Sequence, residues 1–324
     1  MKYTYLGRTG VEVSELCFGT MSFGGDADAS ESAKMYKSCR DSGVNFFDCA
    51  NAYSAGKAEE ILGDLIKGER DELIITTKSY NTTASYKNSG GNNRRHIVKA
   101  VEDSLKRLGT DRIDLHFMHQ WDENTPVEET LRALENLVQS GKVLYLGASN
   151  YSAWQVAKAL GISERHGWTK FDVLQPMYSL VKRQVETEIL PLADAEGLGV
   201  ISYSPVGGGL LSGKYGPNTR PNDGRLLSNS MYAKRYNDEW VFEAAGAFTE
   251  LANEMGVHPV SLAVAWVGGH PNITSPIIGS RNVEQLAPSL ASVTIEMTAD
   301  LREKISALTP TPAPATDRSE SQVE

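Results

Sequence analysis

Val44-Asn45-Phe46-Phe47-Asp48-Cys49-Ala50-Asn51-Ala52-Tyr53 joins an apolar, strand-prone run to an aspartate and then, five residues later, to a tyrosine. The spacing of apolar residues from 57 to 66 then predicts an amphipathic helix. Parallel α/β proteins carry their chemistry at the carboxyl ends of strands, and Asp48 would occupy such a position. The stretch therefore predicts a strand, a loop that bears polar side chains, and a helix.

The same alternation recurs along the whole chain. Most of the apolar runs that read as strands are followed by a segment with helical spacing, and the predicted strands are residues 16–18, 44–47, 73–77, 113–118, 143–146, 171–174, 200–202 and 273–278. Eight strands that alternate with helices are the pattern of an α/β protein of the (β/α)8 TIM-barrel class.

Local signals refine this prediction. A short N-terminal segment with a turn at residues 8–10 precedes the barrel, and capping boxes at Thr125 and Ser152 predict two helix starts. The loop 206–237 follows the seventh strand and is long enough to be a ligand-covering loop. We predict one barrel domain over residues 1–308 and a disordered, proline-rich tail over 309–324.

Composition narrows the classes of partner. The formal net charge of −9 argues against a nucleic-acid partner, because phosphate binding requires an excess of Lys and Arg. The first ten residues have no signal-peptide core and no stretch approaches 18 apolar residues, so we expect a cytoplasmic protein without a membrane partner. Three cysteines without a C-x-x-C motif fit reduced thiols, and Cys49 is better explained as buried filler than as a redox site. The sequence leaves the oligomeric state open.

Polar residues stand where the predicted strands end. In a closed barrel these ends form one rim, so residues that are far apart in sequence become neighbours. A single polar residue in such a place would mean little, but eight of them coincide with strand ends: Asp48, Lys78, His119, Ser149, Asn150, Gln175, Tyr203 and Ser280.

Four residues near this rim suit proton transfer. A lysine ammonium beside a tyrosine favours the phenolate and lowers a pKa that is ordinarily about 10, and a carboxylate keeps the lysine charged. Tyr53 would then be a proton donor, with Lys78 and Asp48 behind it. His119 would hydrogen-bond and polarise a carbonyl oxygen. We predict no metal site, because His116 and His119 lie on opposite faces of one strand and no H-E-x-x-H motif occurs.

The sequence gives weaker support to three other functions. Lys78 could be a Schiff-base nucleophile, but Asp48 would keep it protonated. Residues 208–214 match most of a phosphate-binding P-loop, yet Tyr215 stands where Ser or Thr must bind magnesium. No G-x-G-x-x-G follows an early strand, which argues against a Rossmann dehydrogenase.

Short motifs in a fixed order run from Tyr3 to Leu308. They are Leu6-Gly7-Arg8-Thr9-Gly10, Gly19-Thr20-Met21, Phe47-Asp48-Cys49-Ala50-Asn51-Ala52-Tyr53, Thr77-Lys78, Asp114-Leu115-His116-Phe117-Met118-His119, Gly147-Ala148-Ser149-Asn150, Leu174-Gln175, Ser202-Tyr203-Ser204-Pro205, Gly209-Leu210-Leu211-Ser212-Gly213-Lys214 and Ile278-Gly279-Ser280-Arg281-Asn282-Val283-Glu284-Gln285-Leu286. In these motifs the chain resembles the aldo-keto reductase superfamily, in its bacterial branch related to the potassium-channel β subunits.

The resemblance implies a catalytic tetrad of Asp48, Tyr53, Lys78 and His119 and a nicotinamide cofactor, NADPH or NADH. Ser149, Asn150 and Gln175 would bind the carboxamide, Tyr203 would stack under the ring, and Arg281 with Ser280 would hold the 2′-phosphate of NADPH. The implied cofactor residues are Gly19, Thr20, Met21, Asp48, Ser149, Asn150, Gln175, Tyr203, Ser204, Pro205, Val206, Gly208, Lys214, Gly279, Ser280, Arg281, Gln285 and Ser289. Pro288 and Ser289 depart from the acidic residue and asparagine of the family, which leaves the strength of the NADPH preference open.

The implied function is NADPH-dependent reduction of an aldehyde, ketone or keto-sugar to an alcohol, with Tyr53, Tyr80, His119 and Trp121 around the substrate. The natural substrate and the physiological direction stay open. An alternative is a redox-sensing or assembly subunit that holds NADP(H) and rarely turns over.

Overall fold

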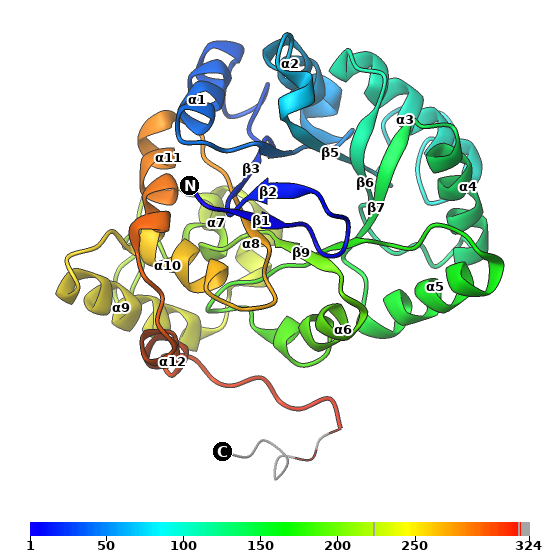
Figure 1. The fold of residues 1–324 in the computed structure, drawn as a ribbon. Helices are drawn as coiled ribbons and strands as arrows, with labels where there is room; N and C mark the ends of the chain where they lie inside the picture. Colours follow the sequence, from blue (N-terminus) through cyan, green and yellow to red (C-terminus); the bar gives the residue numbers. More distant parts are fainter. Residues whose placement is uncertain (223, 317, 319–324) are drawn as a thin grey trace.

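Eight parallel strands close into a barrel with helices around it (Figure 1). The computed structural model describes residues 1–222, 224–316 and 318. The barrel strands, in chain order, are β3 (Cys17–Gly19), β4 (Phe46–Asp48), β5 (Ile74–Ser79), β6 (Ile113–Met118), β7 (Val143–Ser149), β8 (Val173–Gln175), β9 (Gly199–Ser202) and β10 (Ser275–Ile278), and β10 pairs with β3 to close the ring. The predicted (β/α)8 barrel is confirmed.

Helices of the outer layer follow most of the strands. They are α1 (Ala29–Asp41), α2 (Lys57–Leu65), α3 (Arg94–Leu108), α4 (Val127–Gln139), α5 (Ala153–His166), α6 (Ile189–Glu196), α9 (Glu239–Glu254), α10 (Pro259–Gly268), α11 (Val283–Leu290) and α12 (Ala299–Ser306). Among the described residues, no helix is long and apolar enough to cross a membrane.

The barrel interior is filled by large apolar side chains rather than forming a pore. Phe46, Leu115, Phe117 and Ile201 belong to one buried cluster inside the ring. Gly147 on β7 makes room for the Phe117 ring, since a Cβ atom there would stand 2.3 Å from it. A packed interior leaves the ends of the strands as the place for a site.

A two-stranded hairpin that the sequence did not predict closes one end of the barrel. It consists of β1 (Tyr3–Tyr5) and β2 (Glu12–Ser14), and Leu6 and Val13 add to the interior cluster. Gly7 lies against the backbone at the start of β9, because a Cβ atom on Gly7 would stand 2.4 Å from the Gly199 nitrogen. The hairpin therefore covers the amino ends of the strands, at the front of the barrel in Figure 1.

One of the two predicted capping boxes is present. Ser152 and Gln155 form it at the start of α5. The box predicted at Thr125 is wrong: α4 begins at Val127 with Pro126 as an N-cap that makes no side-chain bond. Thr125 lies one residue before this N-cap, and its hydroxyl donates to Asp122 Oδ2 at 2.7 Å.

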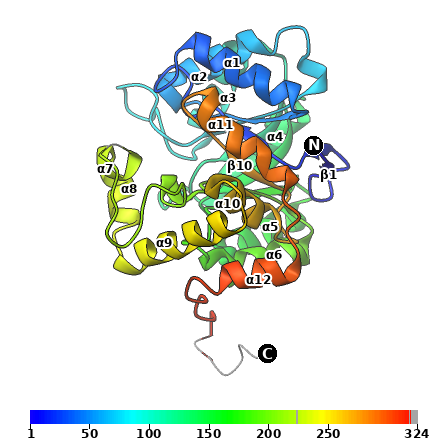
Figure 2. The same ribbon diagram turned by 90° about the vertical axis from the view of Figure 1, so that its left-hand side faces the viewer.

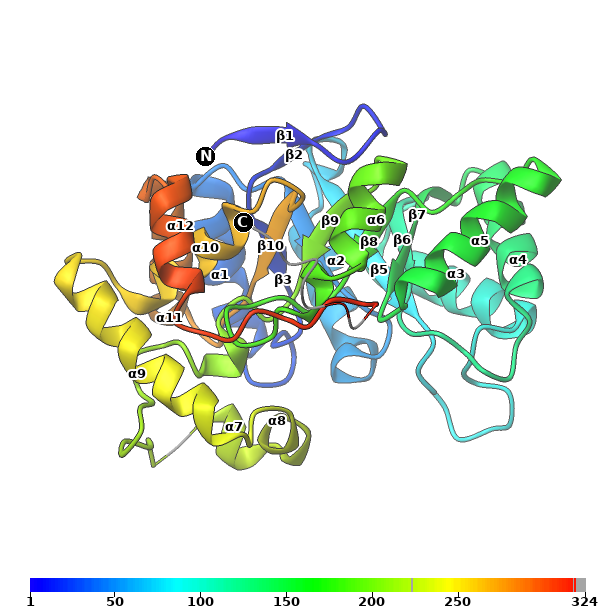
Figure 3. The same cartoon turned by 90° about the horizontal axis from the view of Figure 1, so that it is seen from below.

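The long segment after β9 contains short helices. These are the 3-10 turn η4 (Gly207–Gly209), α7 (Arg225–Ser228) and α8 (Ser230–Arg235), and with α9 they lie on one side of the barrel (Figure 2). The described part of the tail, 309–316, forms neither helix nor strand and runs along the barrel from α12 (Figure 3). Arg183 binds the Thr309 hydroxyl at 3.2 Å, and Thr187 donates to the Ala313 carbonyl at 3.3 Å. Residues 317 and 319–324 of the predicted disordered tail lie outside the described residues.

Candidate active site

A buried ion pair lies at the carboxyl ends of β4 and β5. Lys78 Nζ stands 2.6 Å from Asp48 Oδ2, and neither side chain is more than 4% exposed. The other carboxylate oxygen accepts bonds from Thr76 Oγ1 at 2.6 Å and from Gln175 Nε2 at 2.9 Å. A buried charge pair is tolerated when its polar atoms are also hydrogen-bonded, and these donors meet that condition.

Tyr53 faces this pair from the loop after β4. It begins the 3-10 segment η1 (Tyr53–Gly56), in which Ser54 and Ala55 have left-handed φ angles of 47° and 54°. Non-glycine residues seldom adopt such angles, and they tend to do so at functional sites. The turn brings Tyr53 Oη to 3.3 Å from Lys78 Nζ, while the ring centre lies 4.9 Å from the same nitrogen.

The charge states follow from burial and from the neighbouring charges. Burial lowers the pKa of Lys78, but the charge of Asp48, joined at high pH by that of the Tyr53 phenolate, outweighs it and raises this pKa above its ordinary value, so the amine is an ammonium. Burial raises the pKa of Tyr53 to about 12, although Lys78 opposes the shift. From the sequence we predicted that the effect of Lys78 on the pKa of Tyr53 would dominate. In the structure burial wins, and the phenol holds its proton at neutral pH.

His119 follows β6 and completes the group of four. Burial, and to a lesser extent the charge of Lys78, lowers the pKa of His119 to about 3, so the imidazole is neutral. Its ring stands edge-on to the Tyr53 ring, with centres 6.0 Å apart. The Asn81 amide lies 3.4 Å from His119 Nδ1. If that amide donates to Nδ1, the ring proton is on Nε2, where it can be offered to a ligand.

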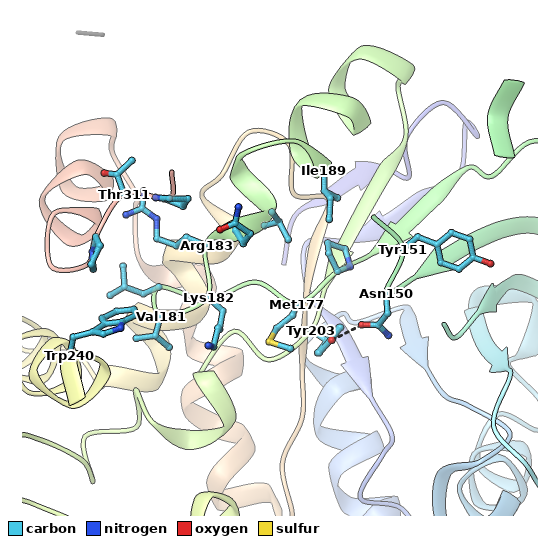
Figure 4. A pocket seen from close by; sticks show the side chains of 16 residues that line it. Asn150, Tyr151, Met177, Val181, Lys182, Arg183, Ile189, Tyr203, Trp240 and Thr311 are labelled. Carbon is cyan, nitrogen blue, oxygen red and sulfur yellow. Dashed lines mark hydrogen bonds between the residues drawn. The ribbon is translucent and has the colours of Figure 1, made fainter. Parts of the chain in front are cut away.

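The side chains expected to bind a carboxamide also converge. Ser149 Oγ donates to the Gln175 carbonyl at 2.9 Å, and Asn150 Nδ2 donates to the His119 carbonyl at 2.9 Å. Tyr203 Oη donates to Asn150 Oδ1 at 2.7 Å (Figure 4). Asn150 and Ser204 have left-handed φ angles of 57° and 61°. The structure therefore gathers these polar groups at the carboxyl ends of β7, β8 and β9, where hydrogen bonds hold them in place.

A cavity of about 510 Å³ opens beside Tyr203 and Asn150 (Figure 4). Met177 lies close to Tyr203, Trp240 lies at the far end, and the tail residues 310–312 contribute one wall. A volume of this size suits a small organic ligand or part of a cofactor. The tail therefore lies against a space that adjoins the site, a contact that the sequence did not predict.

The remaining predicted cofactor residues fall into three groups, at the end of β3, on the segment after β9, and from Gly279 to Ser289. Gly19, Thr20 and Met21 stand at the end of β3, where the Thr20 hydroxyl donates to the Asp48 carbonyl at 3.0 Å. On the segment after β9, from Ser204 to Lys214, Gly208 has a left-handed φ of 66° and lies close against the Tyr232 ring. This left-handed turn would let the backbone of the segment approach a ligand.

The segment expected to hold a 2′-phosphate is already occupied by protein groups. Arg281 forms an ion pair with Asp26 at 3.1 Å, and the Val283 N–H donates to Glu31 Oε1 at 3.0 Å. Ser280 is buried, and its hydroxyl points to the Met35 sulfur at 3.1 Å rather than outward. The Arg281 guanidinium and the Val283 N–H are donors that suit a phosphate, but the carboxylates of Asp26 and Glu31 already accept from them.

The predicted substrate wall includes an aromatic group. Trp121 stands edge-on to Tyr151 at 5.3 Å and to Trp154 at 5.7 Å between ring centres. Tyr80 directly follows β5, at the same rim as His119. Trp154, 61% exposed, was missed, although its place in the first turn of the helix after β7 was a usable signal. Thr76 was missed as well, and its position two residues before Lys78 on the same strand face pointed to it.

Comparisons with known proteins agree with this geometry. A sequence model described as "Aldo/keto reductase family" matches residues 15–309. The chain is 37% identical to "Uncharacterized oxidoreductase YrpG" of Bacillus subtilis (strain 168), over 96% of this chain and 97% of that protein. It is 37% identical to "Probable voltage-gated potassium channel subunit beta" of Arabidopsis thaliana, over 91% and 92% of the two chains. It is 34% identical to "L-glyceraldehyde 3-phosphate reductase" of Escherichia coli O157:H7, over 90% and 88%. The chain therefore belongs to the aldo/keto reductase family and is an NAD(P)H-dependent oxidoreductase.

Proposed function

We propose that the protein reduces the carbonyl group of an aldehyde, ketone or keto-sugar to an alcohol and that NADPH is its preferred reductant. One observation carries this proposal: a fully buried ammonium, Lys78, lies within hydrogen-bonding reach of both the Asp48 carboxylate and the Tyr53 phenol. That arrangement suits a proton donor whose neighbour stays charged throughout the reaction.

The chain's own residues account for the proton. The nicotinamide, when bound, supplies the hydride to the carbonyl carbon. Tyr53 gives its proton to the carbonyl oxygen as negative charge develops there, and Lys78 stabilises the phenolate left behind. The neutral His119 donates a hydrogen bond to the same oxygen, which orients the carbonyl and favours the developing charge. Asp48 keeps Lys78 in place and charged.

The residues around the rim would hold the cofactor. Ser149, Asn150 and Gln175 offer amide and hydroxyl groups that match a carboxamide, and the half-buried Tyr203 ring offers a surface for stacking. The present bonds among these side chains would have to exchange for bonds to the ligand. Their prior alignment limits the conformational entropy lost on binding.

The direct test is a spectrophotometric screen of aldehydes, ketones and sugars with NADPH and NADH side by side. With reactive aldehydes we expect the absorbance of NADPH to fall. In the parallel reactions with NADH, the absorbance of NADH should fall more slowly. If neither cofactor were oxidised across the panel, although both bound, the proposal of a reductase would be wrong.

That outcome would support the second candidate, a subunit that holds NADP(H) and turns over rarely. The observation in its favour is the similarity to proteins described as potassium channel β subunits from Arabidopsis thaliana and Oryza sativa. The two candidates differ in turnover and not in cofactor binding, so the same screen separates them.

We place the reaction in the cytoplasm, on a small diffusible substrate and without a nucleic-acid or membrane partner. The cysteines support this location: Cys17, Cys39 and Cys49 are all free and buried, as suits a reducing compartment. Fractionation of cells that express the tagged chain would test it, and recovery with the membranes or outside the cytoplasm would contradict it.

A further inference from the structure

The start of α11 presents donors suited to a phosphate, and acidic side chains already occupy two of them. Asp26, in the segment between β3 and α1, pairs with Arg281 at 3.1 Å. Glu31, in the first turn of α1, accepts the Val283 N–H at 3.0 Å. Each carboxylate thus takes a group that would otherwise be open to an anion.

The other polar groups of the segment are engaged too. The Gln285 N–H donates to Asn282 Oδ1 at 2.9 Å, and the Ser280 hydroxyl is directed inward at Met35. Hydrogen bonds from Val283 and from Lys34 lower the pKa of Glu31, so this carboxylate is ionised at neutral pH. Before any ligand arrives, Arg281 is therefore paired with Asp26, and the Val283 N–H is bonded to an ionised Glu31.

We propose that Asp26 and Glu31 set the choice of cofactor, by competing with the 2′-phosphate of NADPH for Arg281 and for the Val283 N–H. The inference rests on the proposed function, since it requires that the adenosine end of a dinucleotide lies at this segment. A dinucleotide with a 2′-phosphate must displace Asp26 from Arg281 and approach Glu31. One that carries a 2′-hydroxyl need do neither. The two carboxylates thus narrow the preference for NADPH and let NADH compete.

A purely structural role predicts something different. If the two contacts only joined the β3–α1 segment to α11, removing them would loosen the site for both dinucleotides alike. Competition with the phosphate acts on NADP+ alone. The ratio of the two affinities is therefore the informative quantity, and it can be measured without turnover.

The experiment compares dissociation constants of NADP+ and NAD+, measured by quenching of protein fluorescence, for wild type and Asp26→Asn. Exposed ion pairs are weak, so we expect NADP+ to bind about 3-fold more tightly to the variant and NAD+ to bind as before. Glu31→Gln keeps an oxygen for the Val283 N–H but removes the charge, and should act in the same direction. High salt should reduce both gains, because it screens exposed charges.

The matched control is Asp41→Asn. Asp41 is exposed like Asp26 and pairs with Lys37 at 2.7 Å. It is the last residue of α1, the helix whose first turn carries Glu31, and lies roughly 20 Å from the first residue of that helix. Asp41→Asn removes one negative charge without changing a contact of the segment at the start of α11. It should leave the affinities for NADP+ and NAD+ unchanged. In an Arg281→Gln background, which should itself weaken NADP+ binding about tenfold, the benefit of Asp26→Asn should vanish.

Two results would overturn the inference alone: an unchanged affinity ratio in both Asp26→Asn and Glu31→Gln, or an equal shift in Asp41→Asn. If the wild type bound neither dinucleotide, the proposed function would fall together with the inference. Binding of both with an unresponsive ratio would leave the reductase proposal standing.

Discussion

At the scale of single residues, the Asp48 and Lys78 pair links activity to stability. Removing one partner of a buried pair leaves a buried charge uncompensated, which costs about 3–5 kcal/mol. We predict that Lys78→Met lowers the free energy of unfolding by this order and abolishes turnover. The double variant Asp48→Leu/Lys78→Met should regain much of the lost free energy of unfolding, measured by urea denaturation. It should still show no turnover, measured by NADPH oxidation. A Lys78→Met variant as stable as wild type would mean that Asp48 is not a buried charge.

From the sequence we predicted that Asp48, Lys78 and His119 would lie near one another because they stand at strand ends, and that Tyr53 would join them from the loop after Asp48. We did not predict contacts that depend on how each side chain turns. The Ser280 hydroxyl faces Met35, Gln175 donates to Asp48, and Arg281 pairs with Asp26. The protonation state of Tyr53 escaped for a similar reason, since the depth of burial decides between two opposing effects on its pKa.

At the scale of elements, Glu59 joins the helix after Tyr53 to the strand that carries Lys78. Glu59 of α2 is fully buried, accepts from Arg107 Nε of α3 at 2.7 Å, and accepts from Thr77 Oγ1 of β5 at 2.5 Å. Gly63 lets α2 approach α3 closely, because a Cβ atom there would stand 2.6 Å from the Arg107 carbonyl oxygen. These contacts fix the position of α2, and with it the loop of Tyr53.

We predict that Glu59→Ala lowers the free energy of unfolding by about 3–5 kcal/mol, because Arg107 and Thr77 lose a buried partner. The neighbouring Glu60, whose pair with Lys57 at 2.8 Å is exposed, provides the control. Glu60→Ala should leave the unfolding midpoint in urea nearly unchanged. Equal effects of the two substitutions would contradict the structural role assigned to Glu59.

The elements themselves were predictable where their apolar pattern was strong. The barrel strands are mostly buried, and buried strands require runs of apolar residues. Such runs can be recognised in the sequence. The hairpin of β1 and β2 escaped because Tyr3 to Tyr5 is short and exposed, so no apolar face marks it. Helix α11 was hard to predict because Pro288 lies inside it. The capping box at Thr125 was wrong because α4 begins one residue later than the pattern requires, with Pro126 as its N-cap.

At the scale of the whole molecule, histidines that are fully or partly buried make stability depend on pH. Burial lowers the pKa values of His116 and His119 to about 3 and of His270 to about 4. The unfolded chain takes up protons below about pH 6.5 and the folded chain does not, so stability is full above that pH and falls as the pH drops toward 3. Burial raises the pKa of Asp172 to about 6, which opposes this trend. Burial raises the pKa of Asp114 as well, so two carboxyl groups oppose three histidines, and we expect the histidines to dominate.

We predict a lower melting temperature at pH 5 than at pH 7.5. Each histidine contributes a slope of up to about 1.4 kcal/mol per pH unit. His116, fully buried with Nε2 2.9 Å from the Ser79 hydroxyl, is a good residue to remove. His116→Gln should have a shallower pH dependence between 6.5 and 4, whatever its stability at neutral pH. A melting temperature that does not change over this range would refute the assignment of neutral buried imidazoles.

We also propose that residues 1–308 form one domain, because a single buried cluster extends from Leu16 to Ile305. Calorimetry should then show one unfolding transition, and removal of residues 314–324 should not change it. Two separated transitions would contradict a single domain.

The central claim is that Tyr53 delivers the proton to a substrate that receives hydride from a bound nicotinamide. The most direct measurement compares NADPH oxidation by wild type and Tyr53→Phe with one reactive aldehyde, together with the NADPH dissociation constant of each. Loss of a general acid typically costs 10²–10⁴-fold in rate, so we predict a fall of about that size with cofactor affinity unchanged. Full turnover by Tyr53→Phe would contradict the account.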